Sequence, residues 1–179
     1  MVTSDRRAGG FTLIELMIAI AIMALLLLAA APFTQSWVDG TRQVRARSNL
    51  LEAVGQARAL AMRNPQALTA AEAAQGAAAV VYDSATHTLC VVPRNADGTA
   101  WNMCGAGDWR GQIANPGDLS LESGADDDAE TFVCAAYDTR GILVASSFGG
   151  SACIAPSAGS AATVFIKVGS QEAMDVALL

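Results

Sequence analysis

Residues 9–33, GGFTLIELMIAIAIMALLLLAAAPF, decide the fold of this chain. No residue from Leu16 to Phe33 carries a charge or a strongly polar group, so the apolar run is 18 residues long. With a rise of 1.5 Å per residue, a helix of that length extends about 27 Å, which matches the hydrocarbon core of a bilayer. The stretch therefore predicts a membrane-spanning helix close to the N-terminus.

Glu15 interrupts the beginning of this apolar helix. A carboxylate buried in hydrocarbon destabilises the helix by several kcal/mol unless a cation pairs with it, so an acid in this position indicates a function. A plain membrane anchor is one alternative. A secretory signal cleaved near residues 29–31 is another, but the run is long for such a signal and Pro32 follows those small residues directly.

The segment GFTLIE, residues 10–15, resembles the class III signal of type IV pilins and of the pseudopilins of type II secretion. The resemblance implies that a prepilin peptidase cleaves between Gly10 and Phe11 and N-methylates Phe11. It also places the assembly glutamate of that family at Glu15 and its helix-bending proline at Pro32.

The residues themselves agree with this resemblance. Cleavage at that point leaves a cationic amine on Phe11, one helical turn from Glu15. Opposite charges attract far more strongly in apolar surroundings than in water. In a stack of such helices, the carboxylate of one subunit is therefore expected to neutralise the amine of the next.

The resemblance to pilins, together with the pattern along the chain, implies four regions. They are a leader (1–10), a transmembrane and filament-core helix (11–33), an amphipathic continuation of that helix (34–64) and a β-rich domain (65–179). Arg6 and Arg7 hold the leader on the cytoplasmic side of the inner membrane. The domain is therefore expected to face the periplasm before the subunit enters a pilus or pseudopilus.

The helix is expected to continue to about Asn64, because a proline such as Pro32 bends a helix without having to end it. Apolar residues recur at helical spacing beyond it: Trp37, Val44, Leu51, Val54 and Ala61. Four arginines fall mainly elsewhere, at positions 42, 45, 47 and 63. They form either a solvated face or a basic strip that meets acidic neighbouring subunits.

Charge is distributed unevenly along the 179 residues, whose net charge is −6. Residues 33–64 carry five arginines against two acids, a net +3, whereas residues 65–179 carry four basic residues against thirteen acids, a net −9. Proteins that bind nucleic acid need a positive footprint. The acidic body argues against nucleic acid as a partner.

Strand patterns dominate after residue 78. Two of them flank the turn signal Asp83–Ser84 and predict a hairpin, and the remaining predicted strands are 131–137, 142–145, 163–168 and an edge strand at 176–179. Residues 66–79 predict a short helix or a linker, and 93–118 a long loop. One long helix followed by strands predicts an α+β, pilin-like fold in which the helix packs on an antiparallel sheet.

Parts of the body resemble the GspH/FimT branch of the pilin family. They are the helical segment LLEAVGQARALAMRN (50–64), the series Thr88-Leu89-Cys90, Cys104 and Trp109, and Gly141 with residues 163–166 before Gly169. Some members of that branch bind DNA through basic residues just after the late glycine. Here Ser170, Gln171 and Glu172 follow Gly169, so the resemblance does not extend to DNA binding.

Four cysteines, an even number in a domain expected outside the cytoplasm, favour disulfides: Cys90, Cys104, Cys134 and Cys153. Three pairings are open. We prefer Cys90–Cys104 with Cys134–Cys153, which close the two short loops, although the sequence does not fix the choice. A zinc site is the competing interpretation, but it normally contains a close C-x₂₋₄-C pair, which the sequence lacks.

Few residues suggest catalysis. His87 is the single histidine, and without a nucleophile motif it is expected on the surface of a strand. The acidic run Asp126-Asp127-Asp128 and Glu130 lacks the alternating spacing of a calcium loop and predicts a solvated loop. Trp101 and Trp109 are expected to pack beside a disulfide. We therefore predict a protein that is not an enzyme and that needs no cofactor or metal.

These patterns favour a structural subunit. The main expectation is a minor pilin or pseudopilin of the GspH/FimT type, which prepilin peptidase processes and which joins or primes a type IV pilus through contacts with other pilins. A GspH-like pseudopilin in type II protein secretion is the alternative. A DNA-binding uptake pilin is a second one, which the acidic body argues against.

Overall fold

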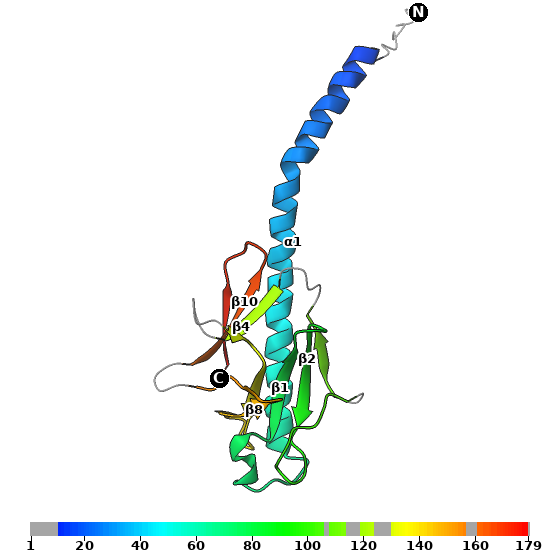
Figure 1. Ribbon diagram of the computed structural model, residues 1–179. Helices are drawn as coiled ribbons and strands as arrows, with labels where there is room; N and C mark the ends of the chain where they lie inside the picture. Colours follow the sequence, from blue (N-terminus) through cyan, green and yellow to red (C-terminus); the bar gives the residue numbers. More distant parts are fainter. Residues whose placement is uncertain (1–10, 106–107, 114–118, 124–129, 157–160, 179) are drawn as a thin grey trace, which may run out of the picture. The chain divides into compact units, whose positions relative to one another are not determined.

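The computed structural model describes residues 11–105, 108–113, 119–123, 130–156 and 161–178 (Figure 1). The chain divides into two compact units, Met1–Val38 and Asp39–Leu179. One helix, α1 (Leu13–Arg63), contributes residues to both units. The backbone is helical on both sides of Pro32, so the proline does not end the helix.

In the first unit, the large apolar side chains of α1 are exposed. The exposed fraction ranges from 53% for Ile22 to 77% for Leu13 over the apolar residues between Leu13 and Leu28. A helix that is apolar on all sides is normally buried in a protein core or in a membrane. Among the residues that the structure describes, none buries these side chains, as expected for a segment that meets lipid or another chain.

In the second unit, α1 buries a face of small residues. Leu50 is fully buried and the residues around it are mostly alanines: Ala46, Ala53, Val54, Ala57 and Ala61. Val54 and Ala61 are buried as the sequence predicted, but the prediction is wrong for Trp37, Val44 and Leu51, which are 74%, 54% and 40% exposed. Small side chains let the sheets approach the helix closely, so burial follows the alanines rather than the larger apolar residues.

The domain contains two main antiparallel sheets. The first has the strand order β3-β2-β1-β6-β7 and consists of β1 (Ala78–Asp83), β2 (Thr88–Pro93), β3 (Arg110–Gln112), β6 (Cys134–Tyr137) and β7 (Leu143–Val144). The second has the order β11-β10-β4-β5 and consists of β4 (Leu119–Ser123), β5 (Glu130–Thr131), β10 (Ala162–Val168) and β11 (Met174–Leu178). A small hairpin of β8 (Ser147–Phe148) and β9 (Ser151–Ala152) completes the strands that the structure describes. The fold is therefore α+β and pilin-like, as the sequence predicted.

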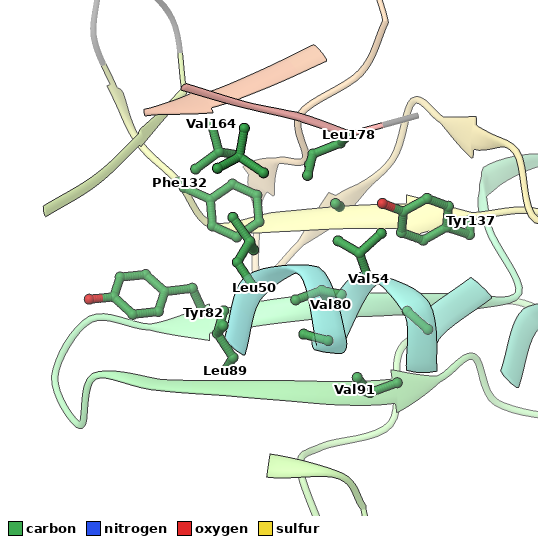
Figure 2. Close-up of a cluster of buried hydrophobic side chains, with 14 of the residues drawn as sticks. Leu50, Val54, Val80, Tyr82, Leu89, Val91, Phe132, Tyr137, Val164 and Leu178 are labelled. Atoms are coloured by element: carbon green, nitrogen blue, oxygen red, sulfur yellow. The ribbon is translucent and has the colours of Figure 1, made fainter. Parts of the chain in front are cut away.

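Both sheets pack against the same segment of the helix. Figure 2 shows Leu50 and Val54 of α1 between Val80 and Leu89 of the first sheet and Val164 of the second. Phe132 and Tyr137 also belong to this core. Alternate residues of the first sheet point the other way and form a second cluster with Cys134 and Cys153.

Two disulfides connect the strands to their loops. Cys90 of β2 is bonded to Cys104, and Cys134 of β6 is bonded to Cys153, with no free cysteine in the chain. These are the two pairs that close the shorter loops. Both thus fasten irregular chain to the first sheet.

Several strands differ from their predicted bounds. The predicted strand 131–137 is two strands in different sheets, because β5 ends at Thr131 and β6 begins at Cys134. β3 lies inside the predicted loop 93–118, and β4 was not predicted. Between the helix and β1, the linker forms the short 3-10 helix η1 (Glu72–Gln75).

Candidate functional site

The start of α1 holds the residues that the sequence marked for assembly. Thr12 precedes the first helical residue, and the Glu15 amide donates to Thr12 Oγ1 at 3.3 Å. In return, Glu15 Oε2 accepts from the Thr12 amide at 3.4 Å and from Thr12 Oγ1 at 3.5 Å. This reciprocal arrangement is a capping box, which satisfies amide groups that a helix leaves unpaired in its first turn.

Glu15 was predicted from the sequence to act in assembly, whereas no role was predicted for Thr12. The pattern Thr-x-x-Glu directly before an apolar run is the signal that predicts a capping box. These hydrogen bonds are long, so they hold the carboxylate only weakly and leave Glu15 Oε1 free of any hydrogen bond in the described residues. Glu15 therefore has a local role at the helix start and spare capacity for a second partner.

Phe11, the residue ahead of the cap, is 87% exposed. Gly10, on the other side of the predicted cleavage site, lies outside the residues that the structure describes. Because the capping groups belong to Thr12 and Glu15, they lie beyond the predicted cut. The first turn of α1 therefore needs nothing from the leader to satisfy these groups.

The beginning of α1 is also long and apolar enough to cross a membrane, judged by its length and composition. Its low charge and its position near the N-terminus fit an anchor in the inner membrane. Figure 1 shows the segment in dark blue, as part of one helix.

The turn between β10 and β11 lies against the second half of α1. The buried Gln43 donates from Nε2 to the carbonyl oxygens of Ile166 and Glu172, at 2.8 and 2.7 Å. Gly169, with φ +54°, brings the turn so close to Asp39 that a Cβ atom there would lie 3.2 Å from Oδ2. The turn after Gly169 thus contains Glu172 and faces Asp39, whereas the DNA-binding proteins mentioned above have basic residues at this position.

His87 does not lie on a strand surface, which corrects the sequence prediction. It is half-buried in the β1–β2 turn with φ +50°, and its Nδ1 is 2.9 Å from the hydroxyl of Tyr82. Burial, followed by the charge of Asp83, raises the pKa of Tyr82, so this phenol stays protonated at neutral pH. The hydrogen bond between Tyr82 and His87 holds the turn against β1. Residues 126–128 of the acidic run lie outside the described residues, and Glu130 is exposed at the start of β5.

A buried arginine organises the loop after β2. Arg94 is 4% exposed, and its guanidinium lies 4.5 Å from the ring centroid of Trp101. It donates to the carbonyl oxygens of Gly98 and Gln75, at 2.8 and 3.3 Å. Desolvation lowers the pKa of Arg94, which remains charged because its ordinary pKa is very high. The buried charge of Arg94 is thus stabilised by the Trp101 ring and two carbonyl groups instead of a carboxylate. The sequence did not predict this structural role for Arg94.

The tryptophans lie where the prediction placed them, beside a disulfide-linked loop. Trp101 packs partly against the cluster around Cys134, and its Nε1 donates to the Ser147 carbonyl at 2.8 Å. Trp109 packs partly against the main core, and its Nε1 donates to Glu52 Oε1 at 3.1 Å. Both side chains therefore connect loops to regular structure.

The described part of the chain contains one cluster of side chains that could in principle bind a metal ion. The Sγ atoms of Cys90 and Cys104 lie close to a carboxylate oxygen of Asp108. The two sulfurs are joined in a disulfide, so neither is available as a thiolate ligand. Asp108 also accepts from the Gly105 amide at 2.7 Å, which gives it a structural use.

A cavity of about 580 Å³ lies beside the same disulfide, between β1, β2 and the segment 131–133. Its charged lining residues are already engaged. Asp83 accepts from Thr86 and Ala85, and Arg110 donates to the carbonyl oxygens of Cys104 and Gly105. These groups hold turns in place, and no acid–base pair converges on the cavity among them.

Comparison with known proteins gives one match, at the N-terminus. Residues 5–31 match a family model described as the prokaryotic N-terminal methylation motif. This motif supports a type IV pilin-like chain, although the match is confined to the N-terminal segment. No curated protein matches it, and neither does any solved structure. The matched segment of this pilin-like chain contains the predicted cleavage site, Thr12, Glu15 and most of the apolar helix.

Proposed function

We propose that this pilin-like chain is a minor pilin or pseudopilin of the GspH/FimT type, a structural subunit that enters or primes a type IV filament. The methylation motif at residues 5–31, joined to a helix whose apolar residues are exposed, carries the proposal. Such a helix is stable only among lipids or among other such helices. A filament built from these subunits provides the second environment.

Assembly requires processing first. In the proposed sequence of events, prepilin peptidase cleaves between Gly10 and Phe11 in the inner membrane and methylates the new amine. The amine of Phe11 then carries a positive charge in apolar surroundings. Glu15 of a neighbouring subunit supplies the matching carboxylate, and its Oε1 is free for this in the described residues. This pairing sets the axial register between helices.

The test of this proposal is the mature N-terminus. Mass spectrometry of the protein purified from its own cells should find a first residue of Phe11 carrying one methyl group. The variant Gly10→Val should remain uncleaved and stay in the membrane fraction. A native polypeptide that begins at Met1, or beyond residue 33, would contradict the proposal.

The machine that uses the subunit is a separate question, and the TLC…C…W series of residues 88–109 favours a pilus over a secretion pseudopilus. A deletion strain that loses twitching motility and keeps protein secretion would support the pilus. Loss of secretion with normal motility would support a type II pseudopilin. In neither machine do we expect the domain to act as an enzyme.

A further inference from the structure

One flank of the second half of α1 combines apolar with basic side chains and is exposed except at Arg58, which is half-buried beside Gly141. We call it the helix flank; its residues follow one another at intervals of three or four: Val44, Arg47, Leu51, Gly55, Arg58 and Met62. Val44, Leu51 and Met62 are 54%, 40% and 56% exposed. Arg47 forms no ion pair with any residue that the structure describes. The flank is therefore an unpaired, positively charged surface with apolar residues along it.

Gly55 has no side chain, so the surface of the helix flank is depressed at this position. Glycine destabilises the interior of a helix relative to alanine, so its presence in a long helix needs a reason. Gly55 has no positive φ, and no atom lies within 4 Å of the position that a Cβ would take. Its own chain thus gives no steric reason for glycine. A second chain could approach the helix backbone closely between Leu51 and Arg58.

The outer face of the second sheet has the complementary character. Phe165 of β10 lies directly between Glu122 of β4 and Asp175 of β11 in the strand register, so the three side chains share one face. Phe165 and Glu122 are half-buried and Asp175 is exposed. Neither carboxylate has a hydrogen bond or ion pair with another described residue, and Lys167 is the one base among the described residues of the same face. We call Glu122, Phe165 and Asp175 the acidic row.

We propose that the helix flank of one copy of this chain binds the acidic row of a second copy. In this contact, Phe165 packs at Gly55 beside Leu51, and Arg47 and Arg58 reach the two carboxylates. The arginines are about 16 Å apart along the helix, from the rise of 1.5 Å per residue. The carboxylates, two strands apart, are separated by about 10 Å. Arginine side chains are long enough to close that difference from both ends.

The two surfaces cannot meet within one molecule. The inner face of the second sheet packs on α1, since Val164, Ile166 and Leu50 belong to one core, and this turns the acidic row away from its own helix. The contact therefore joins different surfaces on the two copies. Such a heterologous contact closes into a ring for some rotations between copies and generates an open helical array for the others; the array is the form that a filament requires. The inference rests on the proposed function, because it names a partner for the subunit inside a filament.

Charge reversal tests the contact with the processed full-length chain in detergent. The flank variant is Arg47→Glu/Arg58→Glu, and the row variant is Glu122→Arg/Asp175→Arg. By sedimentation at about 50 mM salt, where electrostatic interactions are weakly screened, each variant alone should associate at least about tenfold more weakly than the native chain. An equal mixture of the two variants should recover native association, because every flank then meets a row of opposite charge.

The matched control is Arg45→Glu/Arg63→Glu, which makes the same charge change on the other side of the helix. This control should associate like the native chain. Far-UV circular dichroism and thermal unfolding establish that each variant is folded, and the single variant Arg47→Glu replaces the double one if Arg58→Glu lowers the Tm. A second readout is Gly55→Leu, which should keep the Tm or raise it while it weakens association.

Two results would overturn the inference. One is a flank variant that associates like the control. The other is a mixture of flank and row variants that fails to recover, which would mean that the flank binds a protein other than a second copy. Both results leave the mature N-terminus at Phe11 unaffected. The mature N-terminus therefore tests the proposed function, and sedimentation tests this contact independently of it.

Discussion

Glu15 has two roles that substitution can separate: it caps its own helix and, in our proposal, it neutralises the amine of a neighbouring subunit. Glu15→Gln keeps an oxygen that accepts from the Thr12 amide, since glutamine serves in capping boxes as well as glutamate. It removes the negative charge. Thr12→Ala does the reverse, because it removes the hydroxyl that accepts from the Glu15 amide and leaves the carboxylate in place.

The two variants should differ greatly in magnitude. The capping hydrogen bonds are 3.3–3.5 Å long, so Thr12→Ala should destabilise the helix start by about 0.5 kcal/mol, the low end of the capping range. Removing one partner of a buried ion pair costs about 3–5 kcal/mol. Glu15→Gln should therefore reduce incorporation into filaments more than about a hundredfold, since 1.4 kcal/mol corresponds to a factor of ten.

The assay compares sheared filaments with membranes by immunoblotting, in cells that express each variant at the native level. We expect both proteins in the membrane, Thr12→Ala in filaments at close to native amounts, and Glu15→Gln absent from filaments. Equal losses for the two variants would show that capping, not charge, explains the need for Glu15. Normal incorporation of Glu15→Gln would refute the charge-pairing reasoning.

Three further predictions concern the stability of the domain. Leu50→Ala should lower the free energy of unfolding by about 2–5 kcal/mol and Leu51→Ala by much less, because Leu50 is fully buried and its neighbour is 40% exposed; urea unfolding of the two variants tests which face of α1 packs. Asp138→Asn should lower it by about 1–3 kcal/mol. Burial by itself would raise the pKa of Asp138, but hydrogen bonds from the Ile142 and Arg140 amides and from the Arg140 guanidinium outweigh burial and lower it. The contribution of this carboxylate is thus present above its unfolded pKa of about 3.9 and is lost as the pH falls through the folded pKa, so native chain and variant should converge in acid unfolding curves. Replacing Cys90 and Cys104 by alanine opens a loop with a sequence separation of 14, and the Tm should fall in line with a loss of about 3 kcal/mol, whereas a Tm that reductant leaves unchanged would argue against a stabilising disulfide.

The fold class was predictable because its signals are local and strong. The apolar run after Glu15, the helical spacing beyond Pro32 and the alternation around Asp83–Ser84 each predict one element without knowledge of the others. The signal for capping was also local, and Thr12-x-x-Glu15 could have been recognised from the four letters alone. Glu15 was interpreted only through its charge, so the capping role that it shares with Thr12 was not predicted.

Features that depend on tertiary packing were not predictable in the same way. The buried face of α1 consists mostly of alanines, because two sheets approach it closely, and no single-chain periodicity separates those alanines from exposed ones. The segment 131–137 alternates as one strand would, but it passes from one sheet to the other between Thr131 and Cys134. Arg94 resembles any loop arginine until Trp101 and two carbonyl groups are placed around it.

Gln43 has a consequence for the order in which the domain is completed. Its side-chain amide bonds to carbonyl groups 123 and 129 residues further along the chain, so these bonds form only after residues 166–172 have been synthesised. Contacts between distant parts of a chain form late, because a long loop must close first. In a nascent subunit, the Gln43 side chain therefore lacks these two carbonyl partners until the β10–β11 hairpin has formed. In a polypeptide truncated before Ala162, the Gln43 amide would be either buried without these partners or exposed to solvent in an incomplete domain.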